Sequence, residues 1–406
     1  MASYTLHRSP IPPEMTDYII DHLHDDTPAL GACALVCRSW LPAARFHLFS
    51  SVSVHPWKKD AFLALLASST QGGPPRLDSF ASSVRHLYIR EGRGAFEWEQ
   101  KWLSTGLPGL CASLSLGALE SLEIEQVTWE FLAAAARRAL IEHFAPRVRR
   151  LKLRQFEFRT SADMVGFLSR FERLEELRLD GVRWERETVA GELEELEAVG
   201  AVAVPRKLEV LGMNYGRKGP VLEWMMSASG GRIAQAHSVR LGMVTARDTP
   251  VVASYLKELG SSLRELHLHF GTEFYMEQAN LVEQFDLSAN TNLTAVHIYD
   301  LVVDAQAPLP WVTALLRQIK SYRIRQVSFG LQMSCAERAE AVDWAGLEKV
   351  FKGVNWAGLE DVKFLISSNE ADCQCAMARM TREKMQDLEK RGVLGVEAGL
   401  ADRSML

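Results

Sequence analysis

The chain has 406 residues, of which 47% are hydrophobic and 24% are charged, and its formal net charge is −5. This length is roughly two or three times that of an ordinary domain, so the chain must divide into several cores or extend as a repeat array. The mild negative charge argues against sequence-independent nucleic-acid binding, and the lack of about 18 consecutive apolar residues argues against a membrane span.

The N-terminus and the cysteines indicate an intracellular protein. Residues 1–13 include His7 and Arg8 but no apolar stretch or small-residue cleavage site, which argues against a secretory signal. Six cysteines scattered through a chain of this length suit reduced thiols better than a disulfide framework. We therefore expect a protein of the cytoplasm, the nucleus or both.

Residues 9–49 open with the signals of a helix start. Pro12 and Pro13 supply the backbone angle favoured in a first helical turn, and Glu14 suits the positive end of the helix dipole. The apolar residues of this segment then fall three or four positions apart, up to residue 25. They are predicted to share one face of the helix: Ile11, Met15, Ile19 and Leu23.

Two further short helices are predicted before residue 49. Thr27 followed by Pro28 is typical of an N-cap and a first helical position. Ser39 precedes the third helix, in which Pro42 is tolerated because it lies in the first turn. About forty residues cannot enclose a sufficient core, so some of their apolar surface must dock elsewhere.

This segment resembles the F-box family. Residues 11–14, IPPE, are similar to the family's Leu-Pro-x-Glu opening, and residues 35–40, LVCRSW, to its later hydrophobic-Cys-Arg-x-Trp element. The chain resembles in particular the F-box proteins of mushroom-forming fungi, in which such a box precedes a repeat region. The resemblance implies binding to a Skp-type adaptor and, through it, to a cullin scaffold. The adaptor contacts that it implies are Ile11, Pro12, Met15, Ile19, Leu23, Val36 and Trp40.

From residue 84 a short pattern recurs, with hydrophobic residues at its first, fourth and sixth positions. Its copies start about 26 to 35 residues apart, and plausible helices lie between them. A single copy means little, but this spacing indicates a repeat array. The copies are Val84-Leu87-Ile89, Leu119-Leu122-Ile124, Val148-Leu151-Leu153, Leu174-Leu177-Leu179, Leu208-Leu211-Met213, Ala236-Val239-Leu241, Leu263-Leu266-Leu268, Leu293-Val296-Ile298, Ile324-Val327-Phe329 and Leu359-Val362-Phe364.

An extended hydrophobic segment followed by a helix, at a period near thirty residues, is the plan of leucine-rich repeats. We therefore predict an α/β solenoid over residues 84–376, with a curved parallel sheet and outer helices. Helices are expected at 164–171, 251–259, 311–319 and 344–351. The asparagine or cysteine of regular repeats is missing, so hydrophobic packing is expected to replace an asparagine ladder, at Val127, Phe156, Val182, Val244 and Leu301.

The flanking segments are expected to cap this array, between the F-box at 9–49 and the C-terminus. Residues 50–83 are predicted to contain a short strand at Val52 and Val54, a helix at 62–66 and a Gly-Gly-Pro-Pro turn at 72–75. Residues 377–406 are predicted to form a helix over 377–390, ended by Gly392, and an edge strand at 393–396.

Motifs for catalysis or cofactor binding are missing or weak. Residues 212–219 contain glycines and Lys218 but lack the Gly-Lys-Ser/Thr order of a phosphate loop. Cys373 and Cys375 form only half of a thiolate zinc site. His267, His269 and His297 could approach one another on adjacent strands, but solvated histidines are the expected arrangement. We therefore expect no catalytic residue, no cofactor and no metal.

Strand alternation predicts a second face of the sheet, away from the core. The variable residues, which alternate with the hydrophobic residues that point into the core, lie on this second face. Clustered cations on this face would suit an acidic or phosphorylated substrate segment; the alternative is that they pair with carboxylates across strands. The candidate substrate contacts are Arg150, Lys152, Arg154, Arg178, His267, His269, His297 and Tyr299.

With the resemblance, these features imply a non-catalytic substrate receptor of an SCF-type cullin-RING ubiquitin ligase. The F-box would bind the adaptor, and the solenoid would hold a protein substrate near the ubiquitin-conjugating enzyme. One alternative is a leucine-rich-repeat interaction scaffold outside ubiquitination, whose N-terminal helices only cap the first repeat. Another is a leucine-rich-repeat regulator of a small GTPase, although no motif positions a catalytic arginine.

Overall fold

The structure is a computed structural model, and the chain divides in it into two compact units, Met1–Glu157 and Phe158–Leu406. The described residues are 12–70, 82–92, 102–113, 116–186, 203–227, 235–270, 284–303, 309–332, 342–368 and 371–398.

The first compact unit begins with three short helices and continues as strands that alternate with helices. The helices are α1 (Pro13–Asp21), α2 (Thr27–Val36), α3 (Leu41–Leu48), α4 (Lys59–Thr70), α6 (Trp102–Ser113) and α7 (Ala134–Ala139), the last continued by a π-helical turn, η3 (Leu140–Phe144). The strands are β1 (Ser51–Val54), β2 (His86–Arg90), β3 (Ser121–Glu125) and β4 (Arg150–Arg154), and β5 (Glu157–Thr160) starts at the unit's last residue.

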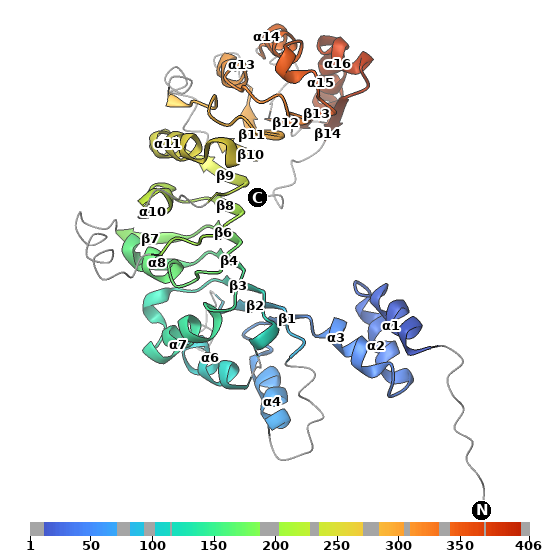
Figure 1. Ribbon diagram of the computed structural model, residues 1–406, viewed down its shortest axis with the longest axis vertical. Helices are drawn as coiled ribbons and strands as arrows, with labels where there is room; N and C mark the ends of the chain where they lie inside the picture. The colour runs from blue at the N-terminus through green and yellow to red at the C-terminus, as the bar shows by residue number, and fades with distance from the viewer. Residues whose placement is uncertain are drawn as a thin grey trace, which may run out of the picture. The chain divides into compact units, whose positions relative to one another are not determined.

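The second compact unit repeats the strand-then-helix order. Its strands are β6 (Glu176–Asp180), β7 (Arg183–Arg186), β8 (Val210–Asn214), β9 (Ser238–Val244), β10 (Glu265–Phe270), β11 (Ala295–Val302), β12 (Gln326–Gln332), β13 (Asp361–Ser367) and β14 (Leu394–Ala398). Its helices are α8 (Ser161–Leu168), α10 (Gly219–Ser227), α11 (Thr249–Leu259), α13 (Pro310–Arg317), α14 (Trp344–Phe351), α15 (Ala371–Lys384) and α16 (Gln386–Lys390). In Figure 1, α8, α10 and α11 lie along one side of β6, β8 and β9.

The strands form a 12-stranded sheet in the order β1-β2-β3-β4-β6-β8-β9-β10-β11-β12-β13-β14, and β5 and β7 form a separate two-stranded sheet. Neighbouring strands run parallel, as in the pairs β1–β2 and β12–β13. Parallel strands in chain order, joined through helices, are the arrangement of a solenoid-like α/β fold. The repeat-like α/β fold predicted from the sequence is confirmed, and every copy of the recurring pattern contributes a strand to this sheet.

The buried residues of each strand stack on those of the next. In β4, Leu151 and Leu153 are buried, whereas Lys152 between them is partly exposed. The register pairs Leu122 with Leu151 and Ile124 with Leu153. Because each strand covers the hydrophobic residues of its neighbour, no repeat has a complete core of its own.

A left-handed backbone residue recurs at the carboxyl ends of the strands. Gln126 (φ 59°), Gln155 (φ 49°) and Asp300 (φ 57°) are examples, and Gly181, Tyr215 and Met243 share the feature. The residue after several of these is fully or almost fully buried, as at Val127, Phe156, Val182, Val244 and Leu301. These are the positions at which regular repeats carry asparagine or cysteine, so the expected hydrophobic substitution is confirmed.

Local details differ from the sequence predictions in three places. Asp26, not Thr27, caps α2, because its side chain accepts a hydrogen bond of 2.9 Å from the amide of Ala29. The helix expected over 377–390 is two helices, interrupted at Met385, which is fully buried. The strands β5 and β7 were not predicted, because they lack the recurring hydrophobic pattern.

Other predictions for the flanking segments have mixed outcomes. The strands expected at Val52–Val54 and at 393–396 are present as β1 and β14, and α4 covers the predicted helix at 62–66. The turn at 72–75 lies outside the described residues. In the described part of the chain, no helix combines the length and the apolar character needed to cross a membrane.

Lys218 is a buried cation that links two successive repeats. Its ammonium donates hydrogen bonds to the carbonyls of Gly216 (2.7 Å) and Met243 (3.1 Å), and its backbone amide donates to Asp248 (3.0 Å). Burial lowers the pKa of Lys218 to about 8, and the charge of Asp248 opposes this shift only in part. Folding therefore disfavours the proton on this amine.

This buried amine predicts a rise in stability with pH. Between pH 8 and 10.5 the unfolded chain binds the Lys218 proton more tightly than the folded chain, so the free energy of unfolding increases with pH in that range. Below pH 8 the full penalty of burying the charge is present. From about pH 7.5 to 9.5, Lys218 should contribute a rise of about 2 kcal/mol.

Urea unfolding of the wild type and of Lys218→Met at these two pH values measures this contribution. The variant retains a long side chain but has no amine, so it should lack the rise. Identical pH dependence in the two proteins would show that the buried amine does not titrate as described.

Candidate functional site

The helices α1, α2 and α3 pack around a small core of their own. Its buried members are Ile20, Leu30, Cys33 and Ala44, and Leu23, Ala34, Trp40, Ala43 and Leu48 pack against it partly buried. This core belongs to the same compact unit as β1–β4, and no separate three-helix domain is delimited. Four buried residues leave much of the apolar surface of these helices uncovered.

Several of the predicted adaptor contacts on these helices are exposed. Met15 is 52% exposed, Ile19 41% and Val36 60%. Pro12 is also exposed, whereas Leu23 and Trp40 pack against the small core, and Ile11 lies outside the described residues. Tyr18 and Leu35, which were not among the predicted adaptor contacts, are also exposed, at 59% and 88%. We call Met15, Tyr18, Ile19, Leu35 and Val36 the exposed helix surface.

The predicted cationic contacts on β4 are paired with carboxylates of the same chain. Arg150 lies 3.4 Å from Glu120, and Lys152 lies 3.5 Å from Glu123. Arg154 lies 3.6 Å from Glu123 and 3.3 Å from Glu125. The parallel register places these pairs, since Glu123 stands opposite Lys152 and Glu125 opposite Arg154.

These ion pairs differ in burial. The side chains of Arg150 and Glu120 are 43% and 41% exposed, so water screens their attraction. The side chain of Glu125 is only 10% exposed, and it also accepts a hydrogen bond from the hydroxyl of Tyr88. Burial, with this hydrogen bond, raises the pKa of Tyr88. Glu125 therefore depends on its partners far more than Glu120 does.

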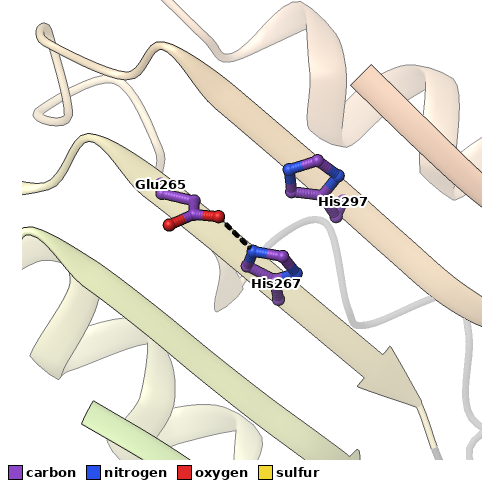
Figure 2. Close-up of side chains that lie close together, drawn as sticks. All are labelled: Glu265, His267 and His297. Carbon is purple, nitrogen blue, oxygen red and sulfur yellow. Dashed lines mark hydrogen bonds and ion pairs between the residues drawn. The ribbon is translucent and has the colours of Figure 1, made fainter. Parts of the chain in front are cut away.

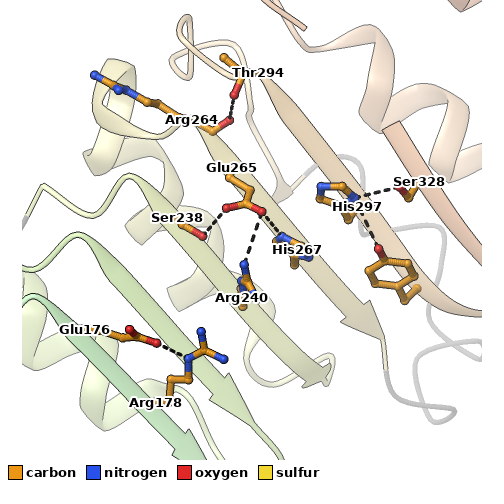
Figure 3. A network of polar contacts seen from close by, with 11 residues as sticks. Glu176, Arg178, Ser238, Arg240, Arg264, Glu265, His267, Thr294, His297 and Ser328 are labelled. Atoms are coloured by element: carbon orange, nitrogen blue, oxygen red, sulfur yellow. Dashed lines mark hydrogen bonds and ion pairs between the residues drawn. The ribbon is translucent and has the colours of Figure 1, made fainter. Parts of the chain in front are cut away.

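In the second compact unit, Glu265 is the centre of a polar network, shown with its two histidines in Figure 2. Its carboxylate accepts hydrogen bonds from His267 Nε2 (2.6 Å) and Ser238 Oγ (2.8 Å). Arg240 Nη2 lies 3.5 Å from the same carboxylate. Figure 3 marks this contact together with the two hydrogen bonds. The hydrogen bonds from His267 and Ser238 lower the pKa of Glu265 to about 2, against the opposing effect of its burial.

The histidines beside Glu265 are neutral. Burial lowers the pKa of His267, and burial together with the neighbouring His267 lowers the pKa of His297 to about 3. An ionised carboxylate only accepts hydrogen bonds, so the proton of His267 is on Nε2, facing Glu265. The Nδ1 atom of His267 then carries a lone pair, and it is buried without a hydrogen-bond partner among the described residues.

The aromatic rings on β10 and β11 stack on one another. The rings of His267 and His297 are 4.2 Å apart and inclined by 22°. His297 Nδ1 lies 3.0 Å from Ser328 Oγ, and His269 Nδ1 lies 3.1 Å from Asp300. The ring of Tyr299 lies 4.7 Å from that of His269.

The expectation of solvated histidines is therefore wrong. His267, His269 and His297 are 5%, 6% and 9% exposed. Parallel strands lie about 4.8 Å apart, so rings at matching register positions cover each other's faces. Arg178, another predicted contact, pairs with Glu176 on its own strand.

Glu265, Arg240 and Ser238 were missed by the sequence analysis. The signal for Glu265 was present, because it precedes His267 and His269 by two and four positions, and alternate residues of a strand share a face. The partners on β9 could not be found in this way, since pairing Ser238 with Glu265 requires the register between the two strands.

A second polar cluster, which includes a carboxyl group with a shifted pKa, lies in the first compact unit. Glu91, Gln126, Gln155 and Glu157 line part of a recess of about 330 Å³. Burial raises the pKa of Glu91 to about 8, and a hydrogen bond from the backbone amide of Leu103 opposes this rise. Leu103 lies in the first turn of α6, so this hydrogen bond satisfies one of the backbone amides that have no partner within the helix.

The difference in burial between the two ion pairs predicts unequal costs of removing their cations. Arg154→Met should lower the free energy of unfolding by about 1–3 kcal/mol, because the buried Glu125 loses a charged hydrogen-bond donor. Arg150→Met should cost about 0–1 kcal/mol, because Glu120 is solvated. Urea unfolding of both variants measures the difference, and equal losses would contradict the assigned role of Glu125.

Comparisons with known proteins leave the family of this chain open. No protein-family model matches the chain, and no curated protein sequence matches it. Among solved structures, a structural-genomics target protein from Bacteroides fragilis matches at 10% identity, with 87% of this chain and 74% of that chain covered. The TM-score of this match is 0.39, which is too low to carry an argument about function.

Proposed function

We propose that the chain is the substrate-receptor subunit of an SCF-type cullin-RING ubiquitin ligase and has no catalytic role itself. In this proposal α1–α3 bind a Skp-type adaptor, and the repeat region binds a protein substrate. The observation that carries the proposal is the exposed helix surface, which includes the F-box-like positions Met15, Ile19 and Val36.

The helices α1–α3 leave several large apolar side chains uncovered. Large apolar side chains clustered on a small helical unit mark an interaction site more often than they mark a free surface. Burying one such side chain against a partner contributes about 1.5–3 kcal/mol. If the helices only capped the first repeat, their apolar residues would lie inside, yet Leu35 is 88% exposed. An apolar groove on another protein is the partner that fits this surface.

The substrate is proposed to bind the repeat region at the strand face that carries the paired charges of β4, within the first compact unit. Holding a protein there would contribute proximity to the ubiquitin-conjugating enzyme. The cations of β4 are already paired with carboxylates, which limits the substrates that can bind them. An acidic or phosphorylated segment would have to compete with Glu120, Glu123 and Glu125 for Arg150, Lys152 and Arg154.

The test of adaptor binding is the double variant Ile19→Ser/Val36→Ser in the full chain. Both side chains are exposed, so the small core should remain intact while the contact with the adaptor is lost. We expect the affinity for a purified Skp-type adaptor to fall by a factor of about 100 or more. Calorimetry measures the affinity, and thermal unfolding checks the fold.

The matched control is Tyr322→Ser/Val354→Ser. These residues are 75% and 81% exposed but lie in the second compact unit. This variant should bind the adaptor as the wild type does. Wild-type affinity of the Ile19/Val36 variant would refute the assigned surface. A wild-type chain that binds no Skp-type adaptor would instead support an interaction scaffold outside ubiquitination.

A further inference from the structure

The strand register brings three metal-binding side chains together on one face of the sheet. Glu265 and His267 are two residues apart on β10, so their side chains leave the strand on the same face. His297 is the register partner of His267 on β11. We propose that Glu265, His267 and His297 bind one divalent transition-metal ion of the zinc class. This proposal does not rest on the ligase assignment.

The donor atoms are close enough for a shared ion. One donor atom from each residue lies within 4.8 Å of the other two, and Figure 2 shows the three side chains. Two imidazoles and one carboxylate form a ligand set that Zn²⁺ uses in proteins, with bonds of about 2.0–2.2 Å. Three protein ligands leave a coordination position open for solvent or for a donor group of a bound molecule.

The three groups offer the donor types that a cation needs. A carboxylate supplies oxygen lone pairs, and an imidazole supplies one nitrogen lone pair while its other nitrogen carries the proton. When the ion binds Nε2 of His267, the proton of that atom moves to Nδ1. Nδ1 has no hydrogen-bond partner among the described residues, so no existing bond has to break for it to carry the proton.

Three existing contacts must change when the ion binds. The hydrogen bond of 2.6 Å from His267 Nε2 to Glu265 is lost, because the ion takes the place of its proton. The rings of His267 and His297 are stacked at 4.2 Å, and a tilt of His297 is needed to aim its nitrogen at the ion. Arg240 lies 3.5 Å from Glu265 and repels a second cation. Arg240 therefore weakens metal binding, and removing its charge should increase the affinity for the ion.

The experiment uses the full chain after removal of metal by a chelator, followed by titration with Zn²⁺ and with Co²⁺. We expect one equivalent of either ion to bind. Co²⁺ should show the d–d absorption of a low-coordinate nitrogen and oxygen site without thiolate charge transfer, which separates this site from binding at cysteines. Wild-type protein that binds neither ion, or binds Co²⁺ through thiolates only, would overturn the proposal.

Variants identify the ligands. His267→Asn and His297→Asn should each weaken Zn²⁺ binding by a factor of at least about 10 to 100, since loss of an outer-shell partner alone has an effect of that size. Arg240→Gln should tighten it several-fold by removing the nearby positive charge. The matched control is His269→Asn, which changes a buried histidine of the same strand that bonds to Asp300 instead. It should leave the affinity unchanged.

The pattern across the variants decides the assignment. Unchanged affinity in His297→Asn, or equal losses in His269→Asn and His297→Asn, would refute the proposed ligand set. If a ligand variant unfolds, Arg240→Gln still provides a test, because weaker binding or no change in that variant contradicts a cation beside Glu265.

Discussion

The parallel pairing of each strand with the next is the interaction on which the rest of this structure depends. Because Leu122 stands against Leu151 and Leu177 against Leu211, the hydrophobic residues of each repeat are covered by a neighbour. The same strand pairing sets the distance between side chains on the face of the sheet away from the core. Side chains at matching register positions lie about 4.8 Å apart there, close enough for ion pairs and ring stacking. The charged and aromatic clusters therefore follow from the stacking of the core.

The strands of the main sheet could be predicted because each one carries its own signal. The recurring hydrophobic positions, such as Leu263, Leu266 and Leu268, are local in sequence and face the core in every copy. The strands β5 and β7 carry no such signal, since β7 is largely exposed and reads Arg-Trp-Glu-Arg. The break at Met385 was missed for a related reason. The sequence pattern continues through it, and the break is visible only in the backbone of the buried Met385, whose φ of −109° and ψ of 41° are not helical.

The partners of the candidate site residues were less predictable. Strand alternation placed Lys152 and His267 on the correct face, but their partners belong to neighbouring strands, and register is a property of the pair. The exposure of the histidines was misjudged because a single strand does not reveal what lies beside it. The small core of α1–α3 was also not predictable from spacing alone. The apolar spacing of the first helix identified Met15 and Ile19 as one face, whereas Ile20, which that spacing did not select, is the residue of α1 that the small core buries.

The left-handed turn at the strand ends affects how neighbouring repeats can differ. An asparagine in such a turn would join repeats through hydrogen bonds of fixed direction, whereas Val127, Phe156 and Val182 contribute only their volume. Apolar contact has no preferred direction, so the size of the buried side chain determines how closely two repeats approach at that edge. Exchanging valine for phenylalanine at such a position therefore changes the angle between neighbouring repeats without breaking a hydrogen bond.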